Sequence, residues 1–458
     1  MTLFEQALLN RNLLFIDDQS GNIFSLKELS SLNFSENNKK ELVFAYLDNS
    51  IESISVFWSF MRGNYCIALL SPGITEHFKK ELEQLYKPSI IYDKTRNEIL
   101  KYDVKSCKDV NYFYLKEDFV IDIHPQIKVL ISTSGTTGSP KFVKLSEGNL
   151  LSNANSICEY LPINSRDVTP LNLPVFYSYG LSVLTSNSLR GGKIVCTNDD
   201  VLKKDFWTSF QKYGYTSFAG VPFVYEMLDR IGFTKKEYPS LKYFTQAGGK
   251  LQDPLVKKYG EYAAQHQIKF YVMYGQTEAT ARMSYLSPND TLNKIGSIGK
   301  PIPHGSFIID EETNELSYKG ANIYGGYVQT AIDLISYNQE DILRTGDIAS
   351  VDEEGFYFIN GRLKRFTKLF GNRINLDEVE SLVAKQFNAN VKCVGFNDTQ
   401  LVIFTNVKEM ELDKIAKFVS SELKLHISVI KHKFVGEIPL TANGKINYTE
   451  LLNNYATK

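Results

Sequence analysis

The sequence predicts an α/β protein, with a large N-terminal domain of layered, largely parallel sheets plus a β subdomain and a small α+β C-terminal domain. Strand-like and helix-like segments alternate between residues 190 and 280, and glycines punctuate short β-like pieces beyond residue 290. A basic run after residue 362 then precedes a new series of strands and helices. At 458 residues the chain is long enough for two or three domains with cores of their own.

Residues 1–120 show only the general alternation. Apolar strand-like runs alternate with helix-like runs, the former at 42–47, 66–70 and 89–92 and the latter at 51–61 and 74–86. This pattern indicates α/β layering and no specific site.

An apolar run at 127–131 leads into a segment of Thr, Ser and Gly that closes on Pro140 and Lys141. Its glycines let several backbone N–H groups point one way, and its hydroxyls add donors, so the loop 133–141 suits a polyphosphate. The Gly-Lys-Ser/Thr triplet of a Walker P-loop does not follow, which disfavours a P-loop kinase or ATPase. On pattern alone, a Ser/Gly linker stays an alternative.

Between 190 and 280, strand, loop and helix follow one another as in parallel βαβ units. The strand-like runs are 193–197, 215–221, 241–246 and 269–275. Asp253 and Pro254 predict a helix start, as an N-cap followed by proline in the first turn. Ligands of such sheets bind where strands end, which points to the loops 133–141, 247–250 and 274–278.

A hairpin is predicted beyond the β-like region. Residues 348–352 and 356–360 form its strands, joined by a three-residue loop that ends in Gly355. Pairing Asp352 with Phe356 sets Asp347 opposite Gly361. Asp347 and Arg362 are therefore expected at the same open end of the hairpin.

The C-terminal domain begins near residues 362–366. A helix is expected from Asn375, with Glu378 completing a capping box. Its buried face is predicted to comprise Leu376, Val379, Leu382 and Val383. Strands at 391–396, 400–407 and 428–435 and a helix over 411–424 complete the predicted domain.

Composition excludes several classes of protein. A formal charge of -1, from 51 basic and 52 acidic residues, argues against a nucleic-acid binder that relies on a large positive field. Five scattered Cys without a CxxC pair predict reduced thiols, and the six His lack metal-ligand spacing. With no signal peptide and no run of 18 apolar residues, we expect a soluble cytoplasmic protein without a membrane span.

Six short motifs are weak evidence singly and strong evidence in the order in which they occur. They are TSGTTGSPK (133–141), AGGKL (247–251), YGQTE (274–278), TGD (345–347), GR (361–362) and NGK (443–445). In these motifs the chain resembles the adenylate-forming superfamily of acyl- and aryl-CoA synthetases, nonribosomal peptide adenylation domains and firefly-type luciferases. The resemblance covers nearly the whole chain and is weakest over the first 120 residues. It implies an AMP-binding domain over 1–363 and a mobile lid domain over 364–458, with the active site between them.

The resemblance also implies two half-reactions. A substrate carboxylate first attacks the α-phosphate of ATP, which gives an acyl-adenylate and pyrophosphate and requires Mg²⁺. A thiol of CoA or of a phosphopantetheinyl carrier protein then takes the acyl group.

The resemblance implies nucleotide-binding and catalytic roles for specific residues. Lys141 and its loop would hold the β- and γ-phosphates, Thr277 would hydrogen-bond the α-phosphate, and Glu278 would hold Mg²⁺. Asp347 would accept the ribose hydroxyls, with Arg362 nearby. The expected ATP- and AMP-binding residues are Thr133, Ser134, Gly135, Thr136, Thr137, Gly138, Lys141, Ala247, Gly248, Gly249, Lys250, Tyr274, Gly275, Gln276, Thr277, Asp347, Arg362 and Lys445.

Three C-terminal positions match the family's moving parts. Lys445 occupies the place of the mobile catalytic lysine, a cation that would bridge carboxylate and phosphate in the adenylation transition state. Lys364 falls at the hinge, and Gly371 matches the glycine that approaches the site in the second conformation. For Lys364 and Gly371, an ordinary basic strand facing solvent is the alternative.

The expected acyl pocket follows the segment 173–181. Tyr177 stands where relatives often have His and where amino-acid-activating members have Asp. Because an aromatic ring cannot pair with a buried ammonium, we disfavour α-amino acids and expect an aliphatic or aryl acid. Further wall residues are Tyr179, Phe218, Ala219 and Gly220, for which a plain hydrophobic core is an equal alternative.

The leading hypothesis is a free-standing acid–thiol ligase that acts on a small carboxylic acid, with CoA or an acyl carrier protein supplied in trans as acceptor. One alternative passes the acyl group to an amine or hydroxyl. The other is a catalytically silent nucleotide-binding homologue, which the intact motif residues disfavour.

Overall fold

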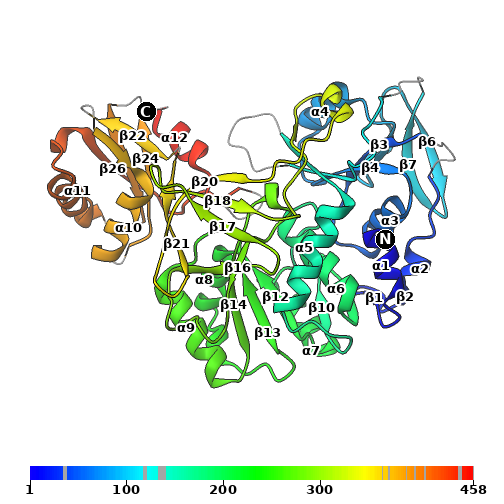
Figure 1. The fold of residues 1–458 in the computed structure, drawn as a ribbon, viewed down its shortest axis with the longest axis horizontal. Helices are drawn as coiled ribbons and strands as arrows, with labels where there is room; N and C mark the ends of the chain where they lie inside the picture. The colour runs from blue at the N-terminus through cyan, green and yellow to red at the C-terminus, as the bar shows by residue number, and fades with distance from the viewer. Residues whose placement is uncertain are drawn as a thin grey trace. The chain divides into compact units, whose positions relative to one another are not determined.

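The computed structural model describes residues 1–34, 39–116, 121–132, 141–363, 365–369, 372–387, 389–396, 399–406, 409–441 and 446–456 (Figure 1). The chain divides into two compact units. The first comprises Met1–Ser306 and Tyr318–Leu343, and the second Phe307–Ser317 and Arg344–Lys458. The predicted domain boundary after residue 363 falls inside the second unit, and the assignment of 364–458 as a mobile lid stays a prediction.

An eight-stranded mixed sheet forms one part of the first unit, in the order β19-β9-β8-β4-β3-β5-β7-β6. The central strands β3, β4, β5 and β8 pair in parallel, and the outer ones are antiparallel. Every residue of β3 and β4 is buried, as expected of apolar runs in a parallel sheet. The strands are β3 (Glu41–Tyr46), β4 (Tyr65–Leu70), β5 (Ile90–Tyr92), β6 (Tyr102–Cys107), β7 (Val110–Leu115), β8 (Val129–Ser132), β9 (Phe142–Leu145) and β19 (Tyr327–Val328), and the crossover helices are α3 (Ile51–Arg62) and α4 (Glu76–Tyr86).

The predicted βαβ series forms a second sheet of this unit. Its parallel strands are β12 (Ser217–Gly220), β13 (Tyr243–Gln246) and β14 (Lys269–Tyr274), extended by antiparallel β15 (Ser284–Leu286) and β16 (Ser297–Pro301). The helices of this series are α7 (Lys204–Tyr213), α8 (Pro222–Arg230) and α9 (Asp253–Gln265), and α8 and α9 pack on β12 and β14 (Figure 1). The start of α9 differs by one residue from the prediction, because Gln252 is the N-cap and Asp253 is already helical.

A four-stranded sheet joins distant parts of the chain. Strands β1 (Leu14–Asp17) and β10 (Val168–Pro170) flank β11 (Lys193–Cys196) in parallel, and β2 (Ile23–Ser25) pairs with β1 in antiparallel fashion. Helices α1 (Leu3–Leu9), α2 (Leu26–Leu29), α5 (Glu147–Tyr160) and α6 (Ser178–Arg190) complete the first unit, with the 3₁₀ turns η1 (Phe233–Lys235), η2 (Thr277–Ala279) and η3 (Ala331–Ile335). Capping boxes fix the starts of α1, α2 and α5.

The second unit contains the predicted hairpin, formed by β20 (Leu343–Val351) and β21 (Tyr357–Arg362), beside β17 (Ser306–Ile309) and β18 (Glu315–Lys319). Gly355 has the positive φ of +80° that the three-residue loop requires. The predicted register is wrong at one step. A bulge between Ile348 and Ala349 shifts the pairing, so that Asp347 lies opposite Arg362 rather than Gly361.

The remaining elements of the second unit include the predicted helices and strands in their predicted order, together with others that were not predicted. They are β22 (Phe366–Leu369), β23 (Asn372–Asn375), α10 (Leu376–Phe387), β24 (Val391–Phe396), β25 (Gln400–Thr405), α11 (Glu409–Leu423), η4 (Ile427–Val429), β26 (Ile430–Phe434) and α12 (Tyr448–Ala456). Asn375 caps α10, since its Oδ1 accepts from the N–H groups of Asp377 at 3.0 Å and Glu378 at 3.4 Å. The buried face of α10 carries Glu380 where Leu382 was expected, because Glu380 forms a 2.7 Å ion pair with Arg365.

Within these described segments, no helix combines the length and apolarity needed to cross a membrane.

Candidate nucleotide site and acyl pocket

The segment after β14 folds into a tight loop that places Thr277 and Glu278. A Cβ on Gly275 would lie 1.7 Å from the carbonyl oxygen of Ala281, so only glycine fits where the chain doubles back. The N–H of Met283 donates to the carbonyl of Tyr274 at 2.9 Å and closes the loop. Thr277 opens the 3₁₀ turn η2, and its Oγ1 lies 3.4 Å from the hydroxyl of Ser178.

Glu278 and Lys141 both contact Tyr327, Glu278 at its hydroxyl and Lys141 at the face of its ring. The hydroxyl of Tyr327 donates to Glu278 Oε1 at 2.9 Å, and Lys141 Nζ lies 3.0 Å from the centroid of the Tyr327 ring. The strand β19 carries Tyr327 and pairs with β9, which begins one residue after Lys141. A cation and a carboxylate are thus held close together without forming a direct ion pair.

The hydroxyl of Tyr327 keeps its proton. Burial raises the pKa of Tyr327, and the nearby Glu278 carboxylate raises it further. The phenol therefore stays a hydrogen-bond donor to Glu278 throughout the physiological pH range. Among the described residues, nothing donates a hydrogen bond to Glu278 Oε2. The hydrogen bond to Oε1 orients the carboxylate, and the other oxygen then suits a hard cation such as Mg²⁺.

The loop after β13 approaches the aromatic segment at the start of α6. Gly248 has a φ of +85°, and a Cβ there would lie 2.5 Å from the hydroxyl oxygen of Tyr177. Gln246, fully buried, donates from Nε2 to the carbonyl of Gly249 at 2.8 Å. Ala247 is buried, whereas Gly249 and Lys250 are exposed. Half-buried Tyr274 and Gln276 follow on the next strand end, as the parallel topology predicts.

In the second unit, Asp347 and Arg362 form an ion pair. Asp347 Oδ1 lies 3.1 Å from Arg362 Nε; the carboxylate is buried, and the guanidinium side chain is 65% exposed. Gly346 has a φ of +73° and donates its N–H to Glu315 at 3.1 Å, which fixes the TGD turn. The predicted proximity of carboxylate and guanidinium is confirmed.

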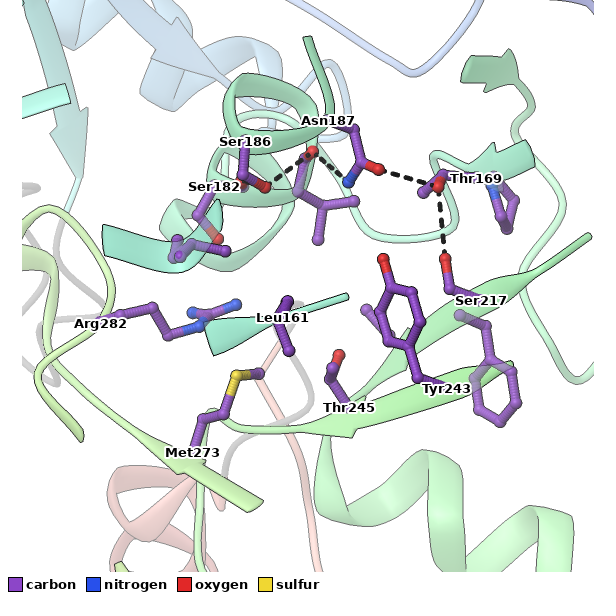
Figure 2. A pocket seen from close by; sticks show the side chains of 15 residues that line it. Leu161, Thr169, Ser182, Ser186, Asn187, Ser217, Tyr243, Thr245, Met273 and Arg282 are labelled. Atoms are coloured by element: carbon purple, nitrogen blue, oxygen red, sulfur yellow. Dashed lines mark hydrogen bonds between the residues drawn. The ribbon is translucent and has the colours of Figure 1, made fainter. Parts of the chain in front are cut away.

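Residues of α5, α6, β10, β12, β13 and β14 line a small cavity of about 20 Å³ (Figure 2). Phe218 and Ala219 line it, whereas Gly220 and Tyr177 do not. Tyr179 is buried beside it and donates its hydroxyl to the Thr245 carbonyl at 2.9 Å. Burial also raises the pKa of Tyr177, so this phenol brings no negative charge to the region.

Most of the lining residues were not predicted, and one of them is charged. Arg282, four positions after Glu278, is buried and reaches the cavity. The only signal in the sequence was a lone charge in the uncharged stretch 279–289, and an arginine is by default expected at the surface.

Several predicted site residues lie outside the described residues. They are Thr133, Ser134, Gly135, Thr136, Thr137, Gly138, Lys364, Gly371 and Lys445. Their roles stay predictions.

The model of the AMP-binding enzyme family matches residues 38–328. The chain belongs to the AMP-binding enzyme family. The recognition drawn from the six motifs is confirmed.

Named relatives of this AMP-binding enzyme include 2-succinylbenzoate–CoA ligases. The ligase of Bacillus cereus is 29% identical over 356 residues, covering 74% of this chain and 71% of the relative. The ligase of Staphylococcus epidermidis is 23% identical over 425 residues, covering 88% and 85%.

Solved structures confirm the fold class. O-succinylbenzoate coenzyme A synthetase from Bacillus subtilis in complex with AMP matches with a TM-score of 0.74 at 21% identity, covering 98% of this chain and 97% of that one. A fatty acyl CoA synthetase from Mycobacterium tuberculosis matches with a TM-score of 0.73 at 17% identity, covering 99% and 97%. The likeness extends over both units of this AMP-binding enzyme.

Proposed function

We propose that this AMP-binding enzyme is an acid–thiol ligase that joins a small carboxylic acid to CoA through an acyl-adenylate. The observation that carries the proposal is the arrangement of Lys141, Tyr327 and Glu278, which holds one cation and one carboxylate beside the turn of Thr277. A phosphate-binding cation and a metal-binding carboxylate at one site are what transfer of an adenylyl group requires.

The first half-reaction forms one bond and breaks another. An oxygen of the substrate carboxylate attacks the α-phosphorus of ATP, and the bond from that phosphorus to the bridging oxygen of the β-phosphate breaks. Lys141, with the loop 133–140, neutralises the departing pyrophosphate. Thr277 donates to the α-phosphate, and Lys445 bridges the incoming carboxylate and the phosphate in the transition state.

Glu278 is the residue that would hold Mg²⁺, which when bound spreads the negative charge of the phosphates. The Tyr327 hydroxyl keeps the Glu278 carboxylate oriented. Asp347 accepts the ribose hydroxyls, and the backbone of 247–249 with Tyr274 lines the adenine.

In the second half-reaction, the thiolate sulfur attacks the acyl carbon, and AMP leaves with the electrons of the broken carbon–oxygen bond. The names of the relatives support CoA as the acceptor. A phosphopantetheinyl carrier protein supplied in trans has the same reactive thiol. A lid formed by 364–458, with its hinge at Lys364, would reorient between the two half-reactions, and Gly371 would enter the site in the second one. We expect the protein in the cytoplasm.

The substrate is proposed to be a small aliphatic or aryl acid without an α-amine, and 2-succinylbenzoate, the acid in the relatives' names, is the first candidate. The neutral phenol of Tyr177 and the cation of Arg282 both disfavour a substrate ammonium near this pocket.

The test is ATP–pyrophosphate exchange with a panel of carboxylic acids, with and without Mg²⁺. We expect acid-dependent exchange that falls at least about 100-fold in Glu278→Gln, because the variant loses a charged metal ligand. Glu261→Gln serves as the matched control, since Glu261 is an exposed residue of α9 that pairs only weakly with Lys257. Nucleotide binding without exchange for any acid would instead favour the silent homologue, and transfer to amines but not thiols would favour the other alternative.

A further inference from the structure

A buried arginine lies at the wall of the cavity with no acidic partner. Arg282 is 4% exposed, and its guanidinium carbon lies 4.0 Å from the centroid of the Tyr179 ring. Its Nε has no hydrogen-bond partner, and in the parts of the chain that the structure describes no carboxylate forms an ion pair with it. Figure 2 shows the side chain reaching toward the centre of the pocket. Arg282 shares a side-chain hydrogen bond with the neutral hydroxyl of Tyr160, and burying the guanidinium is costly because no partner charge offsets its desolvation.

The position of Arg282 is fixed by its backbone. The Arg282 carbonyl accepts hydrogen bonds from Asn153 Nδ2 at 3.0 Å and from Asn322 Nδ2 at 2.9 Å. Both amides are buried, so the backbone cannot move outward without breaking these bonds. The stacking of the guanidinium on Tyr179 adds a second constraint. The charge is therefore held toward the cavity.

The far side of the cavity carries neutral polar groups. Thr169 Oγ1 donates to Asn187 Oδ1 at 3.0 Å and lies 3.3 Å from Ser217 Oγ, on the side of the pocket opposite Arg282 (Figure 2). The hydroxyls of Ser182 and Ser186 donate to backbone carbonyls of α6 at 2.7 Å. These groups satisfy one another and supply no negative charge. Among the described residues that line the cavity, only Arg282 carries a charge, and this charge is positive.

We infer that Arg282 binds the distal carboxylate of a dicarboxylic acid whose other carboxylate is adenylated. The inference rests on the proposed function and narrows its substrate class. A guanidinium presents parallel N–H donors that match the two oxygens of a carboxylate. The cavity volume of about 20 Å³ leaves room beside Arg282 for one small polar group, such as a carboxylate.

The test measures pyrophosphate exchange with acids paired by length: succinate with butyrate, glutarate with pentanoate, adipate with hexanoate, and 2-succinylbenzoate with 4-oxo-4-phenylbutanoate. The wild-type enzyme is expected to prefer the diacid of at least one pair, by kcat/KM, by about 10- to 150-fold, the effect of one charged hydrogen-bonded contact. Arg282→Met should remove this preference and leave the monoacid within about 3-fold of its wild-type value. Arg282→Lys, which keeps the charge but not the fork, should restore part of the preference.

Arg190→Met is the matched control. Arg190 ends α6, is exposed, and donates to the Cys158 carbonyl at 3.4 Å, so the preference should not change. Thermal unfolding and Mg·ATP binding confirm that each variant is folded. Should Arg282→Met fail to fold, the wild-type preference together with Arg282→Lys decides.

The possible failures are distinguishable. A wild-type enzyme that activates monoacids as well as or better than every paired diacid overturns the role of Arg282 and keeps the proposed function. Equal losses for mono- and diacids in Arg282→Met would mean that the residue is only structural. Absence of exchange with all eight acids, while Mg·ATP still binds, overturns the proposed function and the inference together.

Discussion

Replacing Tyr327 with Phe removes a single hydroxyl and keeps the ring beside Lys141. That hydroxyl donates to Glu278 Oε1 at 2.9 Å. A hydrogen bond to a charged group contributes about 1.5–3 kcal/mol, and Glu278 is half-buried, so solvent screening puts this one near the lower value. A change of about 1.4 kcal/mol corresponds to a factor of ten in an equilibrium constant. The substitution should therefore weaken Mg²⁺ binding roughly tenfold, because the carboxylate of Glu278 is no longer held in one orientation.

The assay is the initial rate of ATP–pyrophosphate exchange against Mg²⁺ concentration at fixed ATP. Tyr327→Phe should need about tenfold more Mg²⁺ for its half-maximal rate, because the expected loss lies in a residue that positions Glu278. Tyr262→Phe is the control, since the Tyr262 hydroxyl donates to the Lys236 carbonyl at 2.9 Å, away from Glu278. An unchanged Mg²⁺ dependence in Tyr327→Phe, or an equal shift in Tyr262→Phe, would refute this reasoning.

Two further predictions concern lysines. Lys445→Ala should lower the adenylation rate by about 10²- to 10³-fold, because the bridging cation is needed where carboxylate meets phosphate. The variant should largely spare thiol transfer from supplied acyl-adenylate. Equal loss of both steps would contradict a lid that serves the two half-reactions in different orientations. Burial lowers the pKa of Lys128 from 10.5 to about 8. Between these two pH values the unfolded chain binds more protons at Lys128 than the folded chain does, so the free energy of unfolding rises with pH. The unfolding free energy of the wild-type protein minus that of Lys128→Met should therefore rise by up to about 1.4 kcal/mol per pH unit above pH 8, in denaturant titrations at pH 7 to 10. A difference that stays constant over this range would show that Lys128 does not titrate there.

Local patterns predicted many of the helices and strands, because interactions between residues close in the sequence form them. The βαβ series from 190 to 280 has strong apolar periodicity, and the three-residue loop with Gly355 defines its hairpin. The bulge that places Asp347 opposite Arg362 leaves no such mark, because one extra residue in a strand has no composition of its own.

Long-range pairings were beyond the sequence. Strand β1 pairs with β11, which lies about 180 residues further along the chain, and the sequence of neither strand indicates the other as its partner. On α10, the apolar spacing favoured Leu382, but Glu380 is buried because Arg365 reaches it from an earlier segment. For the same reason Arg282 was missed: its burial depends on Tyr179, Asn153 and Asn322, all more than 35 residues away.

The tyrosine between Lys141 and Glu278 acts as a spacer that keeps two opposite charges from neutralising each other. If lysine and glutamate were bonded directly, the arrival of Mg·ATP would first have to separate them, and affinity would be lost to that rearrangement. With Tyr327 interposed, the lysine contacts the face of the ring and the glutamate its hydroxyl. Each charged side chain is already held in place by the tyrosine, so the site is preorganised for a ligand that carries both signs.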